Sequence, residues 1–207
     1  DIDRQWASFE GRLLMLGFGS IGRGLLPLLL RHIAIAPERI TIMSPESDWE
    51  PMATAQGVAY EVDALTPDNY RQLLAARLGP GDFLLNLSVD VSSRDLIAWC
   101  QEQGVIYLDA CVGPWAGGHF DASLTPARRS NYALRAAVLG LRDGANDGPT
   151  AILSHGVNPG LVSHFVKQAL LNLAADLLPG HAEPSERRDW AECARRLGIR
   201  AIHIAER

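Results

Sequence analysis

The run Gly17-Phe18-Gly19-Ser20-Ile21-Gly22 has the pattern G-x-G-x-x-G, in which each glycine can serve the binding of a phosphate. The first glycine permits a tight turn, the second lets the backbone approach a pyrophosphate, and the third lets a helix pack closely on a strand. The N-terminus of that helix then attracts the phosphates through free N–H groups and a partial positive charge. The run follows the apolar segment 13–16 and precedes an amphipathic segment. We therefore predict a dinucleotide-binding turn, and the alternative is a glycine turn that serves helix packing alone.

A residue that binds the adenosine ribose is expected about 20 residues after such a turn, at the end of the second strand. Ser44 occupies this position, and Glu46 and Asp48 come slightly late. A serine offers one hydrogen bond but not the charge-assisted pair that a carboxylate makes with a diol. Because no Lys or Arg occurs between Ser44 and Gln56, the usual partner of a 2′-phosphate is also absent. The sequence favours NAD over NADP.

Other reactive residue types have both a functional and a structural interpretation. Asp90 follows the fourth predicted strand, so it could hold a substrate ammonium at the carboxyl edge of a sheet, or it could be a solvated loop carboxylate or a helix cap. Asp109, which follows the fifth predicted strand, could either contact the cofactor or act as a cap. Asn158 precedes Pro159, which is the usual arrangement of a helix N-cap. Trp115 is interpreted as a packing aromatic, and the alternative is a platform for a cation–π contact.

The histidines, cysteines and serines indicate no further chemistry. His155 and His164 lack the i, i+4 spacing of helical metal ligands, so no metal site is expected. The three scattered cysteines have no C-x-x-C spacing and fit a reducing cytoplasm. No G-x-S-x-G elbow accompanies the serines, which excludes a serine hydrolase of that kind.

The elements that must position these groups alternate between short β-rich runs and longer helical ones. Strands are predicted at 13–16, 40–43, 58–62, 83–86 and 105–108, and helices at 21–33, 67–77 and 92–103. This alternation predicts an α/β fold, a Rossmann-like doubly wound parallel sheet with the start of a second α+β domain. After the turn cluster 144–149 we expect a strand at 150–153, helices at 158–177 and 190–197, and a strand at 200–205. The predicted domains are 1–149, which binds NAD, and 150–207, the beginning of a catalytic and dimerisation domain.

Composition excludes several classes of protein. A chain of 207 residues with 47% hydrophobic residues can bury one core and part of another, which argues against disorder, collagen and coiled coil. A net charge of −5 without a dense basic run argues against nucleic-acid binding and mildly favours cationic small molecules. No segment has the apolar length of a membrane span. Because the chain starts at Asp1 and stops after an apolar segment, we expect it to be part of a longer protein.

Six separated segments together resemble the bacterial homospermidine synthases of the saccharopine dehydrogenase-like group. They are 17–24 (GFGSIGRG), 86–93 with NLSVD and two serines, 114–115, 129–135 (RSNYALR), 156–163 (GVNPGLVS) and 202–207 (IHIAER). Members of that family run to more than twice this length. The chain is therefore similar to the N-terminal part of one.

The resemblance implies an NAD-dependent aminoalkyl transferase of polyamine biosynthesis. Putrescine is oxidised to an imine, ammonia is lost, and a second putrescine forms a new imine that the same NADH reduces to homospermidine. Spermidine can also donate the aminobutyl group. The resemblance further implies a homodimer at full length, and the scattered cysteines favour the cytoplasm.

The resemblance also implies roles for individual residues. The expected catalytic residues are Asp90, Asn158 and Glu206. The expected cofactor-binding residues are Gly17, Gly19, Ser20, Ile21, Gly22, Ser44, Ser88, Val89 and Asp109.

One position departs from the family. Gly113 precedes Pro114-Trp115 where the family has a glutamate that faces the amines. Loss of that carboxylate puts efficient homospermidine synthesis in doubt, because a charge-assisted hydrogen bond contributes about 1.5–3 kcal/mol. Two alternatives stay open: an NADP-dependent saccharopine- or carboxynorspermidine-type oxidoreductase, and a non-catalytic dinucleotide-binding fragment or sensor. We expect the 207-residue polypeptide by itself to bind NAD weakly or not at all and to make no homospermidine.

Overall fold

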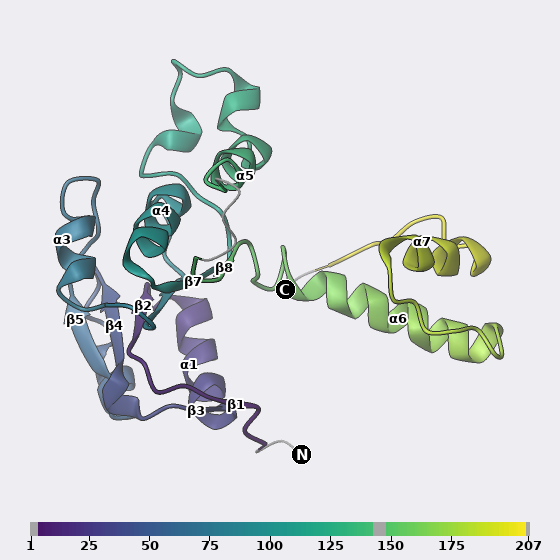
Figure 1. Cartoon of the computed structure of the whole chain (residues 1–207), viewed down its shortest axis with the longest axis horizontal. Helices are drawn as coiled ribbons and strands as arrows, with labels where there is room; N and C mark the ends of the chain where they lie inside the picture. Colours follow the sequence, from purple (N-terminus) through teal and green to yellow (C-terminus); the bar gives the residue numbers. More distant parts are fainter. Residues whose placement is uncertain (1–3, 143–147, 206–207) are drawn as a thin grey trace. The chain divides into compact units, whose positions relative to one another are not determined.

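The structure is a computed structural model that describes residues 4–142 and 148–205. The chain divides into two compact units between Ser154 and His155 (Figure 1). Each unit is described by itself below.

The first unit is built on a six-stranded sheet in which every neighbouring pair is parallel. Its order is β5-β4-β2-β6-β7-β8. The bounds are β2 Leu13–Leu16, β4 Ile40–Ser44, β5 Ala59–Val62, β6 Phe83–Asn86, β7 Ile106–Asp109 and β8 Ala151–Ile152. The chain enters this sheet in the middle at β2, winds outward through β4 and β5, and returns to the other side of β2 at β6. This order confirms the predicted doubly wound, Rossmann-like fold.

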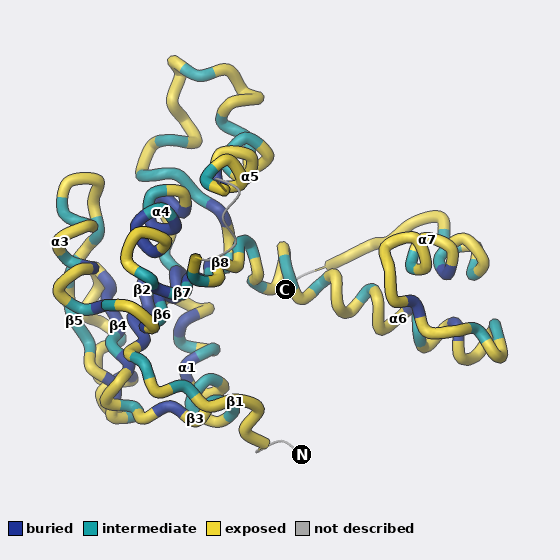
Figure 2. The backbone as a smooth tube through the Cα atoms, in the orientation of Figure 1, coloured by how far each residue is buried: buried dark blue, intermediate teal, exposed yellow. Residues whose placement is uncertain are grey.

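Helices cover both faces of this sheet. Alternate residues of the central strand β2 pack against the helices on the two faces. Leu13 and Met15 pack in a cluster with Leu26 of α1 (Ser20–His32) and Ala53 of α2 (Glu50–Thr54). Alternate residues of β2, Leu14 and Leu16, pack against the other set of helices: α3 (Tyr70–Ala75), α4 (Ser93–Gln103) and α5 (Asn131–Leu139). All four residues of β2 are buried, as expected for a central strand covered on both faces. Figure 2 shows the buried residues concentrated in the inner strands of the sheet and in α4.

Several local predictions for the first unit needed correction. The helix predicted at 67–77 begins at Tyr70 instead of Pro67. Residues 66–69 form a turn in which the Thr66 N–H donates to Asn69 Oδ1 at 2.7 Å. The short parallel pair β1 (Ala7–Ser8) and β3 (Ile33–Ala34) was not predicted. Helices α2 and α5 were also missed, together with the 3-10 turns η1 Pro37–Arg39, η2 Gly118–Phe120 and η3 Pro126–Arg129. By contrast, α4 begins and ends as predicted, with Ser92 Oγ accepting the Asp95 N–H at its N-cap.

The second unit contains two helices, α6 (Leu161–Leu177) and α7 (Arg187–Arg196). They pack through a small cluster of Leu170, Ala174 and Cys193. The predicted strand at 200–205 is wrong, since none of these residues forms a strand in the described part of the chain. A strand needs a neighbour for its backbone hydrogen bonds, and the apolar pattern that suggested it carries no information about one.

The start of α6 differs from the prediction that Asn158 caps it. The helix begins at Leu161, after Gly160 with φ of 133°. The preceding loop closes on itself, because Gly156 N–H donates to Pro159 O and Leu161 N–H donates to Gly156 O, both at 2.9 Å. Asn158 is therefore an exposed loop residue and not the N-cap.

No helix in residues 4–142 and 148–205 is long and apolar enough to cross a membrane.

Candidate dinucleotide-binding cleft

The first and third glycines of the turn between β2 and α1 are required by the fold itself. Gly17 has φ of +83°, and a Cβ there would lie 2.9 Å from both Cα and N of Ser88. A Cβ on Gly22 would lie 2.9 Å from the carbonyl oxygen of Gly17 and 3.1 Å from the Phe18 ring. Larger residues at these two positions would push the turn away from β6 or push α1 away from the turn.

The second glycine is different, because no atom lies within 4 Å of the place where a Cβ on Gly19 would stand. Gly19 is the N-cap of α1, and no side chain caps that helix. A side chain at this position would fill the open space in front of the helix N-terminus. That space, with the N–H groups of the first helical turn beside it, is the kind of cradle that binds phosphate. Ser20, Ile21 and Gly22 form this first turn.

A cleft of about 440 Å³ opens at the carboxyl edge of the sheet. Its volume lies within the ~300–1,000 Å³ range of small-molecule sites. It spans the point where the strand order reverses between β2 and β6, which is where doubly wound sheets bind their ligands. The lining residues come from the ends of β2 and β4, the segments that follow β2, β4, β5 and β6, and the segment after β7: Leu16, Gly17, Gly19, Met43, Ser44, Pro45, Glu46, Asp63, Ala64, Leu65, Leu87, Ser88, Val89, Asp90, Val91 and Ala116.

The β4 and β5 side of the cleft is acidic. Ser44 is buried, and its carbonyl oxygen accepts the Asp63 N–H at 3.1 Å, which holds the two strand ends together. Glu46 is held through its carbonyl oxygen, which accepts the Tyr60 hydroxyl. Among the described residues that line the cleft, none is Lys or Arg. This side can therefore accept hydrogen bonds from ribose hydroxyls, and it opposes a 2′-phosphate by charge.

Asp63 was missed by the sequence analysis, although a signal was present. Asp63 directly follows β5, just as Asp90 follows the loop at the end of β6. The rule that drew attention to Asp90, that ligands bind at the carboxyl ends of parallel strands, applies equally to Asp63. Glu46, which seemed slightly late along the chain, also lies in the lining.

The β6 side of the cleft carries Ser88, Val89 and Asp90. Asp90 is exposed and has φ of 61°, a left-handed conformation that Asp tolerates better than most residues. Its carbonyl oxygen accepts the N–H of Ala116 at 3.1 Å, and Ala116 also lines the cleft. The side chain of Val89 is largely exposed, so this side combines an apolar surface with a free carboxylate.

Asp109 lies behind this side of the cleft and is not among its lining residues. It is fully buried at the end of β7, where Oδ2 accepts the Tyr107 hydroxyl at 3.0 Å and Oδ1 accepts the Ser154 N–H at 2.5 Å. Desolvation by burial raises the pKa of the Asp109 carboxyl above its ordinary value. Burial, followed by the charge of Asp109, likewise raises the pKa of Tyr107.

Gly113 and Trp115 occupy the segment after β7. Gly113 exchanges two hydrogen bonds with Ser93: its N–H donates to Ser93 Oγ at 3.1 Å and its carbonyl oxygen accepts the Ser93 N–H at 2.9 Å. A Cβ on Gly113 would lie 3.7 Å from Val91 O, an ordinary contact, so the backbone there would accept a side chain.

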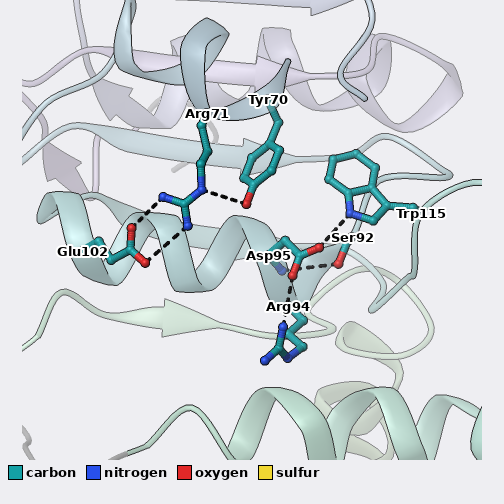
Figure 3. Close-up of polar contacts among 7 residues, drawn as sticks. All are labelled: Tyr70, Arg71, Ser92, Arg94, Asp95, Glu102 and Trp115. Atoms are coloured by element: carbon teal, nitrogen blue, oxygen red, sulfur yellow. Dashed lines mark hydrogen bonds and ion pairs between the residues drawn. The ribbon is translucent and has the colours of Figure 1, made fainter. Parts of the chain in front are cut away.

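Trp115 is held by polar and aromatic neighbours, as Figure 3 shows. Its indole N–H donates to Asp95 Oδ2 at 2.7 Å, and its ring packs against Tyr70 with centroids 5.5 Å apart. Beside them, Arg71 of α3 forms an ion pair with Glu102 of α4 at 2.8 Å. These contacts give Trp115 a packing role between α3 and α4.

The remaining predicted residues lie in the second unit or outside the residues that the structure describes. Asn158 is in the loop before α6, and the rings of His155 and His164 pack edge to face with centroids 5.6 Å apart. Glu206 lies outside the described residues. Within the described ranges, no three His, Cys, Asp or Glu side chains gather closely enough to hold a metal ion.

Comparison with known proteins agrees with this geometry. Residues 13–152 match the model of the saccharopine dehydrogenase NADP binding domain. The chain is 49% identical over 201 residues to a homospermidine synthase of Blastochloris viridis, covering 96% of this chain and 42% of that protein. It is 42% identical over 207 residues to a homospermidine synthase of Mesorhizobium japonicum, covering 98% of this chain and 43% of that protein.

A solved structure is similar over the same extent. The homospermidine synthase of Legionella pneumophila, crystallised in complex with NAD, is 37% identical with a TM-score of 0.77, over 91% of this chain and 39% of that one. The chain thus spans about two fifths of the length of the relatives it matches. With its glycine turn, its sheet order and this match over residues 13–152, the chain belongs to the family of the saccharopine dehydrogenase NADP binding domain and is a homologue of the homospermidine synthases.

Proposed function

We propose that the chain forms the NAD-binding part of a homospermidine synthase, which joins two putrescines, or spermidine and putrescine, by aminobutyl transfer with release of ammonia. The observation that carries the proposal is 49% identity to such an enzyme over nearly the whole chain, combined with a cleft whose residues fit the cofactor. We extend the proposal to a homodimer at full length from the resemblance, and to the cytoplasm from the scattered cysteines.

The residues of the cleft fit NAD in three places. The open space at Gly19 and the N-terminus of α1 suit the pyrophosphate. Ser44, Glu46 and Asp63 suit the adenosine ribose, and the segment 88–90 suits the nicotinamide nucleotide, since the two halves of a doubly wound sheet each bind one nucleotide. NAD supplies the hydride chemistry when bound, and the protein supplies orientation and charge.

The acidic side of the cleft supports NAD instead of NADP, although the matched family is described by NADP binding. Glu46 and Asp63 would repel a 2′-phosphate, and no basic residue among the described lining residues would offset this. The same observation argues against the NADP-dependent saccharopine- or carboxynorspermidine-type oxidoreductase.

The amine substrates are dications, and Asp90 is the carboxylate of the cleft best placed to hold an ammonium group near the nicotinamide half. A charge-assisted hydrogen bond of this kind contributes about 1.5–3 kcal/mol. We propose Asn158 and Glu206 as further catalytic residues on the resemblance alone. Gly113, which removes a carboxylate that the family would supply, favours one second candidate, a dinucleotide-binding protein without catalysis.

The test uses the full-length gene product. Titration calorimetry with NAD and NADP should give tighter binding of NAD, and incubation with putrescine and NAD should then give homospermidine above a boiled control. Binding of NAD without product would support the non-catalytic candidate, and tighter binding of NADP would support the oxidoreductase.

A further inference from the structure

A chain of hydrogen bonds, buried at its centre, runs behind the β6 side of the cleft. It joins Ser88, which lines the cleft, to Asn86, Tyr107 and Asp109, and ends at Ser154; we call it the buried relay. Tyr107 and Asp109 are fully buried, and Asn86 is 3% exposed. The centre of the relay therefore lies where water cannot replace a lost partner, and each unmade hydrogen bond between Asn86, Tyr107 and Asp109 would be costly.

Both ends of the relay fix the direction of its hydrogen bonds: the Asp109 carboxylate at one end, and at the other the Ser88 N–H, which can only donate. An ionised carboxylate can only accept, so the Ser154 N–H and the Tyr107 hydroxyl both donate to it. Tyr107 has one proton, and Asp109 takes it, so the Tyr107 oxygen must accept from Asn86 Nδ2 at 3.2 Å. The amide oxygen of Asn86 consequently faces Ser88.

This orientation fixes what Ser88 can offer to a ligand. Asn86 Oδ1 accepts the Ser88 N–H at 3.2 Å and the Ser88 hydroxyl at 2.6 Å. Both donors of Ser88 are thus directed inward, and the hydroxyl oxygen retains only its acceptor capacity. Ser88 also contacts the glycine turn, since a Cβ on Gly17 would lie 2.9 Å from its Cα.

We propose that Asn86, Tyr107 and Asp109 are positioning residues that make Ser88 a hydrogen-bond acceptor for the nicotinamide half of the cofactor. The ligand group is a donor, either a ribose hydroxyl or the carboxamide N–H. The inference rests on the proposed binding of NAD in this cleft. Because the relay lies in the β6–β7 half of the sheet, it acts on the nicotinamide nucleotide and not on the adenosine nucleotide.

The test compares three ligands, NAD, ADP-ribose and ADP, by calorimetry at pH 8 on the full-length gene product. Tyr107→Phe removes the hydroxyl that accepts from Asn86 Nδ2 and so leaves that buried N–H without its partner in the relay. Asp109→Asn keeps the shape of the side chain. Because the amide oxygen of the new asparagine still accepts the Ser154 N–H, its amide nitrogen faces Tyr107 as a donor. This variant replaces Tyr107→Phe if the latter does not fold. Tyr70→Phe is the matched control, because Tyr70 packs on Trp115 and does not line the cleft. Thermal melting of each variant checks that it is folded at the assay temperature.

We expect both relay variants to weaken NAD binding about tenfold while ADP binding stays unchanged, and the control to change neither. Loss for ADP-ribose as well as NAD identifies the ribose hydroxyl as the donor, whereas loss for NAD alone identifies the carboxamide. Equal weakening of NAD and ADP would mean general damage to the fold and would overturn the inference, as would unchanged NAD binding. If the wild-type protein binds neither NAD nor ADP, the proposed function itself fails, and that result is distinct from both.

Discussion

The two glycines Gly17 and Gly19 stand two residues apart in one turn, yet their replacement by alanine should have opposite consequences. An alanine at position 17 would be forced into a left-handed backbone conformation, and its Cβ would lie 2.9 Å from the backbone of Ser88. The conformation costs roughly 1–2 kcal/mol and the overpacking roughly 1–3 kcal/mol, so Gly17→Ala should lose about 2–5 kcal/mol of unfolding free energy. This is a large fraction of the ~5–15 kcal/mol typical of a domain.

At Gly19 the same methyl group meets no protein atom within 4 Å, and the backbone has φ of −73°, which alanine adopts freely. Gly19→Ala should therefore change the unfolding free energy by less than about 1 kcal/mol. The methyl group instead enters the space proposed for the pyrophosphate, so NAD binding should weaken at least about tenfold.

Urea denaturation measures the first effect and titration calorimetry the second, both on the full-length gene product. The comparison of the two variants separates a glycine needed by the fold from one needed by the ligand. The assignment of the space at Gly19 to the pyrophosphate is refuted if Gly19→Ala binds NAD as tightly as the wild type, or if this variant loses as much stability as Gly17→Ala.

Three further predictions concern charge at and behind the cleft. In the double variant Glu46→Gln, Asp63→Asn, the affinity for NADP relative to NAD should rise about tenfold by calorimetry, because two carboxylates no longer repel the 2′-phosphate; an unchanged ratio would contradict the assigned adenosine side. Burial raises the pKa of Asp109, so its contribution to stability is present below the ordinary Asp pKa and lost as pH rises through the raised value of the folded state. Urea denaturation at a series of pH values measures the unfolding free energy of the wild type and of Asp109→Asn. The wild-type value minus the variant value should therefore fall with rising pH, and a constant difference would contradict the raised pKa of Asp109. Gly113→Glu should fold normally and lower the KM for putrescine about tenfold in steady-state assays, and a raised KM would mean that this position does not face the amine.

The sheet could be predicted from the sequence because its strands are short apolar runs between turns. All four residues of Leu13–Leu16 are buried, and a run of this kind has one interpretation once a glycine turn and an amphipathic helix follow it. The helix α4 was equally predictable, since Ser92 and Asp95 carry its start and Gly104, with φ of 71°, ends it.

Predictions failed where a residue's partner is distant along the chain or is not implied by a local pattern. Asn158 has the sequence of an N-cap, but the loop before α6 closes through the backbone of Gly156 instead. The buried relay joins Asn86, Tyr107 and Asp109 across two strands, and the strand pattern predicts that these residues are in or at the end of strands without revealing their hydrogen bonds. Asp63 was missed for another reason, because the partner of the ribose was sought only at the end of the second strand, whereas Asp63 follows the third predicted strand.

The stoichiometry of the reaction tests the central proposal most directly. The full-length gene product is incubated with putrescine and an amount of NAD far below that of putrescine, and homospermidine, ammonia and NADH are measured. Because the cofactor would be oxidised and reduced within each turnover, the account predicts homospermidine in large excess over NAD, one ammonia for each homospermidine, and no accumulation of NADH. Absence of homospermidine, or NADH that accumulates in proportion to product, would contradict it.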